Sequence, residues 1–225
     1  MKKGVLSIEG FDYNNNCSDN CDCGVKAVKK RHSIIREKTD FFDIGNGLDL
    51  QLNTDRIKNA IYHMLKNYDH PTLMFIAHGR QGFNKELLLV YDDVYVSSTE
   101  ILDFIKKNSK DNHAVDCGFF SCWAGDAFKG LRSLPPDSCM VSLCSNNEYN
   151  YNTSTQDFHH AIARTKGEFS LKNAFIEYLR SSSYKTGNPT IGMPSKGILQ
   201  IPRTELNKGK EQRIELSNRV ADFMK

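Results

Sequence analysis

The apolar residues of this chain form two kinds of pattern, namely short continuous runs and stripes that have the spacing of one helix face. Continuous runs bounded by turn residues are typical of buried strands. They occur at Gly4–Ile8, Thr72–Ala77, Ala114–Ser121 and Cys139–Cys144, with a short final run near Gly197–Ile201. Phe41–Ile44 and Leu48–Leu52 predict an extended segment interrupted by glycines. Leu87–Tyr91 and Val94–Val96 predict a β-hairpin.

Helical stripes lie between these runs, and several begin at a residue that favours a helix N-terminus. Asn53 or Thr54 precedes one stripe, and Ser170 precedes another. Ser97 and Glu100 have the spacing of a capping box. Further helices are predicted from Val25 to about Lys38, from about Gly125 to Leu131, and from about Lys210 onward. The polar stretch at 145–157 is predicted to be a long surface loop.

Strands that alternate with helices predict an α/β fold with a mostly parallel sheet flanked by helices on both faces. The sequence contains no internal repeat and no linker-like segment, so we expect one domain over residues 1–225. In open sheets of this kind, ligands bind beyond the carboxyl ends of the strands. Residues that directly follow a predicted strand are therefore the candidates for chemistry.

Composition narrows the class of protein. A length of 225 residues allows one substantial core, and a net charge of +3 does not point to nucleic acid as a partner. No apolar stretch of about 18 residues is present, so we expect no membrane span. The N-terminus lacks a secretory segment, and we expect a cytosolic protein, in its own cell or in a host. Seven cysteines without an export signal predict free thiols, and Cys117, Cys139 and Cys144 are expected to be buried.

Two of the predicted strands end in residues that are suited to nucleophilic catalysis. The first runs TLMFIAHG and ends at His78, and the second runs GFFSCWAG and ends at Cys122. The hairpin and helix between them leave enough chain for the two strands to become parallel neighbours. The sequence then predicts a thiolate–imidazolium pair, in which Cys122 is the nucleophile and His78 delivers a proton to the leaving amine.

Small residues around this pair favour the same chemistry. Gly79 has no side chain, so its N–H can approach a substrate carbonyl and form an oxyanion hole together with the N–H of Cys122. Ala124 and Gly125 let the chain turn into the following helix, whose positive N-terminal end would favour a thiolate at Cys122. The predicted chemistry requires no cofactor.

The remaining cysteines and histidines favour structural roles. The spacing of Cys17, Cys21 and Cys23, with His32, is not typical of a zinc site, so we expect no metal. His159 and His160 are expected to be surface residues. Trp123 is either a packing anchor or part of a wall against the substrate.

The motifs FIAHG and FFSCWAG resemble the signature strands of clan CD cysteine peptidases, the superfamily that includes caspases, legumains and gingipains. There, one strand ends in His-Gly and the next parallel strand ends in Ala-Cys or Ser-Cys. The predicted order of elements is also similar from Gly4 to Leu179, with a second strand near Leu48. The resemblance implies a caspase-like fold, with His78 as general acid, Cys122 as nucleophile and Gly79 in the oxyanion hole.

The resemblance also implies where a substrate would bind, and here the chain departs from the family. The residue two before the nucleophile often lines the S1 pocket with a polar group; here it is Phe120, which implies an apolar wall. Asp19 and Asp22 lie in the loop after the first strand, where they would either favour a basic substrate residue before the cleaved bond or be solvated. Ser145 and Asn146 would either bind substrate backbone or form an ordinary turn.

Together these residues predict a cysteine endopeptidase that acts on protein or peptide substrates through a thioester acyl-enzyme. One alternative is an enzyme with the same dyad that acts as an acyl transferase or a deamidase. Another is a catalytically silent caspase-like module that binds partners. Activity is expected to be constitutive, or to depend on internal cleavage or on an activating ligand or partner.

Overall fold

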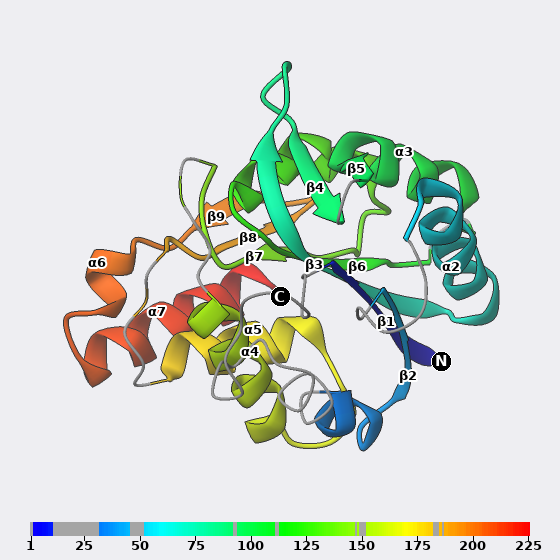
Figure 1. Cartoon of the computed structure of the whole chain (residues 1–225). Coiled ribbons are helices and arrows are strands. Elements are labelled where there is room, and N and C mark those ends of the chain that lie inside the picture. Colours follow the sequence, from blue (N-terminus) through cyan, green and yellow to red (C-terminus); the bar gives the residue numbers. More distant parts are fainter. Residues whose placement is uncertain are drawn as a thin grey trace, which may run out of the picture.

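The computed structural model describes residues 2–10, 32–45, 52–91, 94–110, 113–146, 148, 152–181, 185 and 187–225. Within these ranges, nine strands form one sheet (Figure 1). Parallel pairing joins, in spatial order, β2 (Asp40–Ile44), β1 (Lys3–Gly10), β3 (His70–Gln81), β6 (Asp116–Phe120) and β7 (Met140–Ser142). Beyond β7, the strands β8 (Thr190–Met193) and β9 (Gly197–Gln200) add an antiparallel edge.

The last part of β3 leaves the parallel sheet and pairs with a hairpin. This hairpin consists of β4 (Leu87–Tyr91) and β5 (Val94–Ser97), and it stands above the sheet in Figure 1. The hairpin can pair there because β3 has 12 residues and β6 pairs only with its part up to Ile76, which leaves the last residues of β3 for β4.

Helices cover both faces of the sheet (Figure 1). One face is covered by α2 (Thr54–Asn67), α3 (Ser98–Asn108) and the 3₁₀ helix η1 (Ala124–Ser133). The other face is covered by α4 (Asn152–Arg164), α5 (Leu171–Arg180) and α7 (Lys210–Phe223), with the short α6 (Arg203–Leu206) before α7. Among the described residues, no helix is both long and apolar enough to cross a membrane.

Alternate residues of the central strands point into two separate cores. Along β3, Leu73 and Phe75 join the core beneath α2 and α3, whereas Met74 and Ile76 join the core beneath α4 and α5. A strand that is buried on both faces reads as a continuous apolar run, which is why the sequence pattern located these strands. The predicted mostly parallel α/β sheet with helices on both faces is therefore confirmed.

The predicted helix caps are present. The side-chain oxygen of Asn53 accepts a hydrogen bond from the N–H of Arg56 at 2.9 Å, and Ser97 Oγ accepts one from Glu100 N–H at 3.3 Å. Ser170 Oγ accepts one from Asn173 N–H at 3.4 Å. Each cap satisfies an N–H group that has no partner within its own helix, which sets where the helix begins.

The structure corrects the predicted strands at β3 and β8 and bears on the predicted second strand. β3 does not end at His78 but continues to Gln81, because its last residues pair with β4. The second strand, β2 at Asp40–Ile44, confirms the extended segment predicted at Phe41–Ile44, whereas the strand expected near Leu48 lies outside the described part of the chain. β8 was not predicted, since its four residues, TIGM, form too short an apolar run to stand out.

The expected surface loop at 145–157 was wrong in its second half, because α4 begins at Asn152. Polar residues hide the start of this helix, but Phe158, Ala161 and Ile162 form a buried apolar face on it. The same helix buries His159, which was expected on the surface, and leaves His160 exposed. Tertiary packing thus decides a helix that local propensity does not indicate.

Candidate active site

His78 lies on β3 at the point where the strand changes partners. Up to Ile76, β3 pairs in parallel with β6, and from His78 onward it pairs antiparallel with β4. His78 is exposed, whereas its neighbours Ala77 and Gly79 are buried. Because side chains alternate along a strand, His78 follows Met74 and Ile76 on the side of the sheet that α4 and α5 cover. The imidazole is therefore open to solvent at the carboxyl edge of the parallel sheet.

Cys122 follows β6 after one intervening residue and is half-buried. The next residue, Trp123, adopts a left-handed backbone conformation with φ of 55°, which is uncommon for a residue other than glycine. Its N–H donates to the carbonyl of Glu148 at 2.9 Å, and η1 starts at Ala124. Strained backbone of this kind is concentrated at functional sites, so the sharp turn is a reason to look for chemistry at Cys122.

Gly79 joins the two strand ends. A Cβ built on Gly79 would lie 2.0 Å from the carbonyl oxygen of Cys122 and 3.1 Å from its backbone nitrogen. No side chain can occupy that space, so the backbone of residue 79 lies directly against the peptide of Cys122. The structure therefore brings the His-Gly and Ser-Cys ends together, as the sequence predicted from their positions on neighbouring parallel strands.

The segment after β7 packs against the same turn. Ser145 is buried and Asn146 is exposed, and a Cβ on Gly125 would lie 2.3 Å from the backbone nitrogen of Asn146. The two residues thus lie beside the chain that follows Cys122, although their predicted contact with substrate stays a prediction. Ser145 uses its backbone N–H to donate to the carboxylate of Glu148 at 2.9 Å.

Glu148 is a residue of this region that sequence reasoning missed. Its carboxylate also accepts from the backbone N–H of Asn188 at 2.8 Å, and its own carbonyl accepts from Trp123. Burial alone would raise the pKa of Glu148, but the hydrogen bonds from Asn188 and Ser145 outweigh it and lower that pKa. Glu148 therefore joins three segments: its carbonyl bonds the turn after Cys122, and its carboxylate bonds the segment after β7 and the entry to β8. Nothing in the polar run around Glu148 marks it out in the sequence.

A second thiol lies beneath the turn. Cys144 is fully buried and its Sγ donates to the carbonyl of Ser121 at 3.1 Å. Burial raises the pKa of Cys144 to about 12, so this thiol stays protonated and nonreactive near neutral pH. Cys117 and Cys139 are also buried free thiols, and burial raises the pKa of each. The expectation that these three residues are buried is confirmed.

The predicted role of Phe120 as a wall of the S1 pocket is not supported by its position. Phe120 is fully buried, and its ring centroid lies 4.9 Å from that of Phe158 on α4. Strand alternation directs this side chain to the face that α4 covers, and α4 was not expected there. The structure places Phe120 in the hydrophobic core instead of at a substrate-facing surface.

The other predicted residues divide into two groups. Asp19 and Asp22, and the three cysteines considered for zinc (Cys17, Cys21 and Cys23), lie outside the described residues. His32 is buried, and its Nε2 lies 2.6 Å from the carboxylate of Glu9. Trp123 packs against the core beneath α2 and α3, which supports the packing anchor of its two predicted roles.

No protein-family model and no curated protein matches this sequence. Solved structures of similar shape are nevertheless found among the caspases. The crystal structure of the Drosophila initiator caspase Dronc has a TM-score of 0.54 and 11% identity, over 92% of this chain and 84% of that one. Caspase-1 from Spodoptera frugiperda has a TM-score of 0.51 and 11% identity, over 88% of each chain. The chain therefore has a caspase-like α/β fold.

Proposed function

We propose that this protein is a cysteine endopeptidase in which Cys122 is the nucleophile and His78 is the general acid and base. The observation that carries the proposal is the contact between the Gly79 backbone and the Cys122 peptide. It sets the strand that bears the histidine beside the turn that bears the cysteine. The exposure of His78 and the partial exposure of Cys122 at the carboxyl edge of the sheet support the proposal further.

The reaction follows from these groups. The Cys122 thiolate attacks the carbonyl carbon of the scissile bond, and the carbonyl oxygen takes up the negative charge. As the tetrahedral intermediate collapses, the C–N bond breaks and the His78 imidazolium gives its proton to the leaving amine. The product is a thioester between Cys122 and the acyl part of the substrate. Water then adds to the thioester, neutral His78 accepts its proton, and the Cys122 thiolate leaves.

The backbone supplies the groups that would stabilise the oxyanion. The N–H of Gly79 and the N–H of Cys122 are proposed as its donors, because the backbone of residue 79 lies directly against the peptide of Cys122. The left-handed turn at Trp123 supports this role, since it directs the chain sharply away after Cys122. Ser145 and Asn146 are proposed to bind substrate backbone from the adjacent segment.

The experiment is to incubate the reduced protein with a diverse peptide library and identify the products by mass spectrometry. We expect cleavage by wild type, and a rate lower by about 1,000-fold or more in Cys122→Ala and in His78→Ala. His160→Ala is the matched control, because His160 is an exposed histidine on α4, and it should cleave like wild type.

Other outcomes would identify the alternatives. Ligated or deamidated products that depend on Cys122 would replace the peptidase with an acyl transferase or a deamidase. Activity that persists unchanged in Cys122→Ala would remove Cys122 from the mechanism. If wild type forms no product and Cys122 shows no enhanced reactivity toward alkylating agents, the chain is a caspase-like binding module.

A further inference from the structure

A cavity of about 450 Å³ lies between α4, α5 and α7, on the sheet face opposite α2 and α3. Its charged lining residues are four cations and two acids: Arg164, Arg180, Lys210, Arg213, Asp157 and Glu177. The cations come from three different helices, so their convergence is a product of the fold. None of these residues belongs to the candidate active site.

The positive charges of this cavity exceed the negative charges that could neutralise them. Glu177 pairs with Arg180 at 3.8 Å. Within the described ranges, no carboxylate lies within ion-pair distance of Arg164, Lys210 or Arg213. The Nε atom of Arg213 is buried and has no hydrogen-bond partner among the described residues. A buried donor without an acceptor is costly, and a bound anion would satisfy it.

A further cation lies beneath the cavity. Lys185 is fully buried, with its Nζ 4.0 Å from the ring centroid of Tyr178, and it donates to Ser181, which lines the cavity. Burial lowers the pKa of Lys185 to about 8, while the charge of Asp157 acts to raise this pKa and the charges of Arg213 and Arg164 act to lower it. Arg213 and Arg164 therefore lie close enough to Lys185 for their charges to act on it, and Lys185 adds a buried positive charge to the field of the cavity.

The N-terminus of α7 adds to this field. Lys210 is the first residue of this 14-residue helix, and Gly209 provides no side-chain cap. The first N–H groups of a helix point away from it and carry partial positive charge, which makes them donors for an anion. The free N–H groups lie next to Arg213, one turn further along the same helix.

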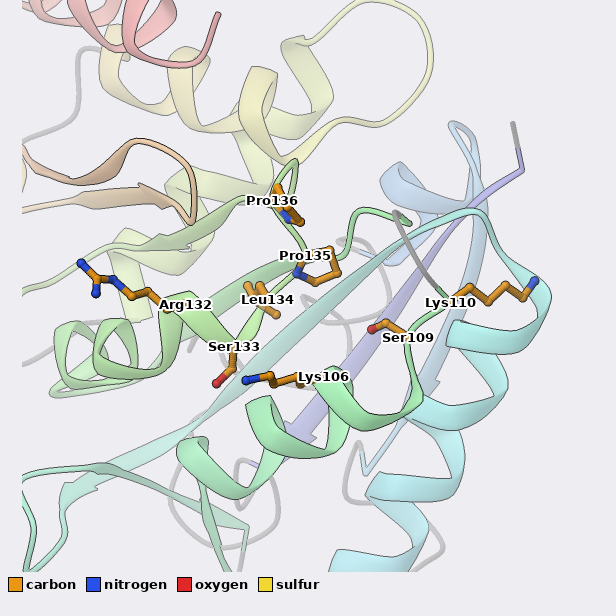
Figure 2. Close-up of a pocket in the computed structure, with 8 residues that line it drawn as sticks. All are labelled: Lys106, Ser109, Lys110, Arg132, Ser133, Leu134, Pro135 and Pro136. Atoms are coloured by element: carbon orange, nitrogen blue, oxygen red, sulfur yellow. The ribbon is translucent and has the colours of Figure 1, made fainter.

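A second cavity is also lined by cations, but its cations are arranged differently from those between α4, α5 and α7. It has a volume of about 510 Å³ and is lined by Lys106, Lys110 and Arg132 (Figure 2). Figure 2 shows Arg132 and Lys110 pointing in opposite directions. Lys106 lies in the last turn of α3 and Lys110 follows the C-cap Ser109, so both cations lie near the negative end of the helix and help to neutralise it. The two lysines of this cavity therefore stabilise the end of a helix, and the cavity serves as a control for the anion-binding experiment below.

We propose that the cavity between α4, α5 and α7 binds a small anion that carries two or more phosphate groups. Guanidinium groups form paired hydrogen bonds with phosphate oxygens, and two arginines from different helices suit two phosphates better than one. The volume is in the range of about 300–1,000 Å³ that is usual for small-molecule sites.

The test is calorimetric titration of the reduced full chain with inorganic tripolyphosphate, with sulfate at equal ionic strength as the comparison. We expect saturable binding of tripolyphosphate, weakened about tenfold or more in Arg164→Glu/Arg213→Glu. Lys106→Glu/Arg132→Glu changes the net charge by the same amount in the control cavity and should bind within about twofold of wild type. Equal weakening in both double variants, equal binding of sulfate, or no binding by wild type would overturn the proposal.

A second measurement needs no variant and so does not depend on folding of a mutant. Phenylglyoxal modifies accessible arginines, and peptide mapping reports the extent of modification at each one. Tripolyphosphate should protect Arg164 and Arg213 and leave Arg132 unprotected. Protection of all three, or of none, would contradict the assigned site.

Discussion

The backbone of Gly79 lies so close to Cys122 that a Cβ at position 79 would be 2.0 Å from the Cys122 carbonyl oxygen. The contact is between main-chain atoms, which cannot move aside as a flexible side chain can. Position 79 therefore accepts only glycine if the two strand ends are to keep their spacing. The proposed catalytic geometry depends on this one contact.

Gly79→Ala should separate the two proposed oxyanion donors and the dyad. We expect cleavage to fall by about 100-fold or more, because the donors would no longer point at one substrate oxygen. Gly82→Ala just after β3 is the matched control, since the atoms nearest to its Cβ would belong to side chains, Glu86 at 2.9 Å and Leu88 at 3.1 Å. The prediction is wrong if Gly79→Ala cleaves peptides as fast as Gly82→Ala.

Cys122 should be the most reactive of the four cysteines that the structure describes. Burial raises the pKa of Cys117, Cys139 and Cys144, and for Cys144 to about 12, so near neutral pH these three carry little thiolate. Brief treatment with iodoacetamide followed by peptide mapping should label Cys122 ahead of them. Faster labelling of Cys144 than of Cys122 in the folded protein would contradict the assignment.

Phe120→Ala should act on stability, not on substrate choice. Removing a fully buried phenylalanine leaves a cavity against Phe158, and such changes cost about 3–5 kcal/mol. We expect a lower free energy of unfolding in urea, and Phe120→Leu should lose less. If Phe120→Leu changes which peptides are cleaved but leaves stability unchanged, Phe120 contacts the substrate as predicted and the core role is wrong.

Glu148→Gln should destabilise the protein in a pH-dependent way. Hydrogen bonds from Asn188 and Ser145 overcome the effect of burial and lower the pKa of Glu148 below 4.5, so the folded state favours the ionised carboxylate. The stability that this provides is present above pH 4.5 and is lost as the pH falls through the folded-state pKa. Urea unfolding of wild type and variant should differ near neutral pH and converge in acid.

Glu211→Gln is the control for that series, because Glu211 is an exposed glutamate in the first turn of α7. It should change stability little at any pH. A difference between wild type and Glu148→Gln that stays constant from neutral to acid pH would show that ionisation of Glu148 is not what stabilises the turn.

Asp19 and Asp22 test the predicted preference for a basic substrate residue before the cleaved bond. If they line the S1 pocket, Asp19→Asn/Asp22→Asn should lower kcat/KM for such substrates about tenfold or more, because a charged partner is lost. Rates for peptides with an apolar residue at that position should change little. The same loss for both kinds of peptide would show that the two residues do not select the substrate.

Local sequence determined most elements and the edge of the sheet at which chemistry would occur. The caps at Asn53, Ser97 and Ser170 are short-range signals, because a side chain bonds an N–H only two or three residues away. Buried parallel strands leave an equally direct signal, a continuous apolar run. Because β3 and β6 are parallel neighbours, His78 and Cys122 both lie just beyond the last residues that these strands pair, Ile76 and Phe120, at the same edge of the sheet.

Only the tertiary structure decided which side chains are buried beneath that edge of the sheet and which segments contact one another around it. The burial of Phe120 depends on Phe158 of α4, a helix whose polar start has no local helix signal. Glu148 becomes a tie between segments only because Asn188, 40 residues later, returns to the same place. Such contacts join residues far apart in the chain, and their free energy comes from packing and desolvation that a local pattern does not contain.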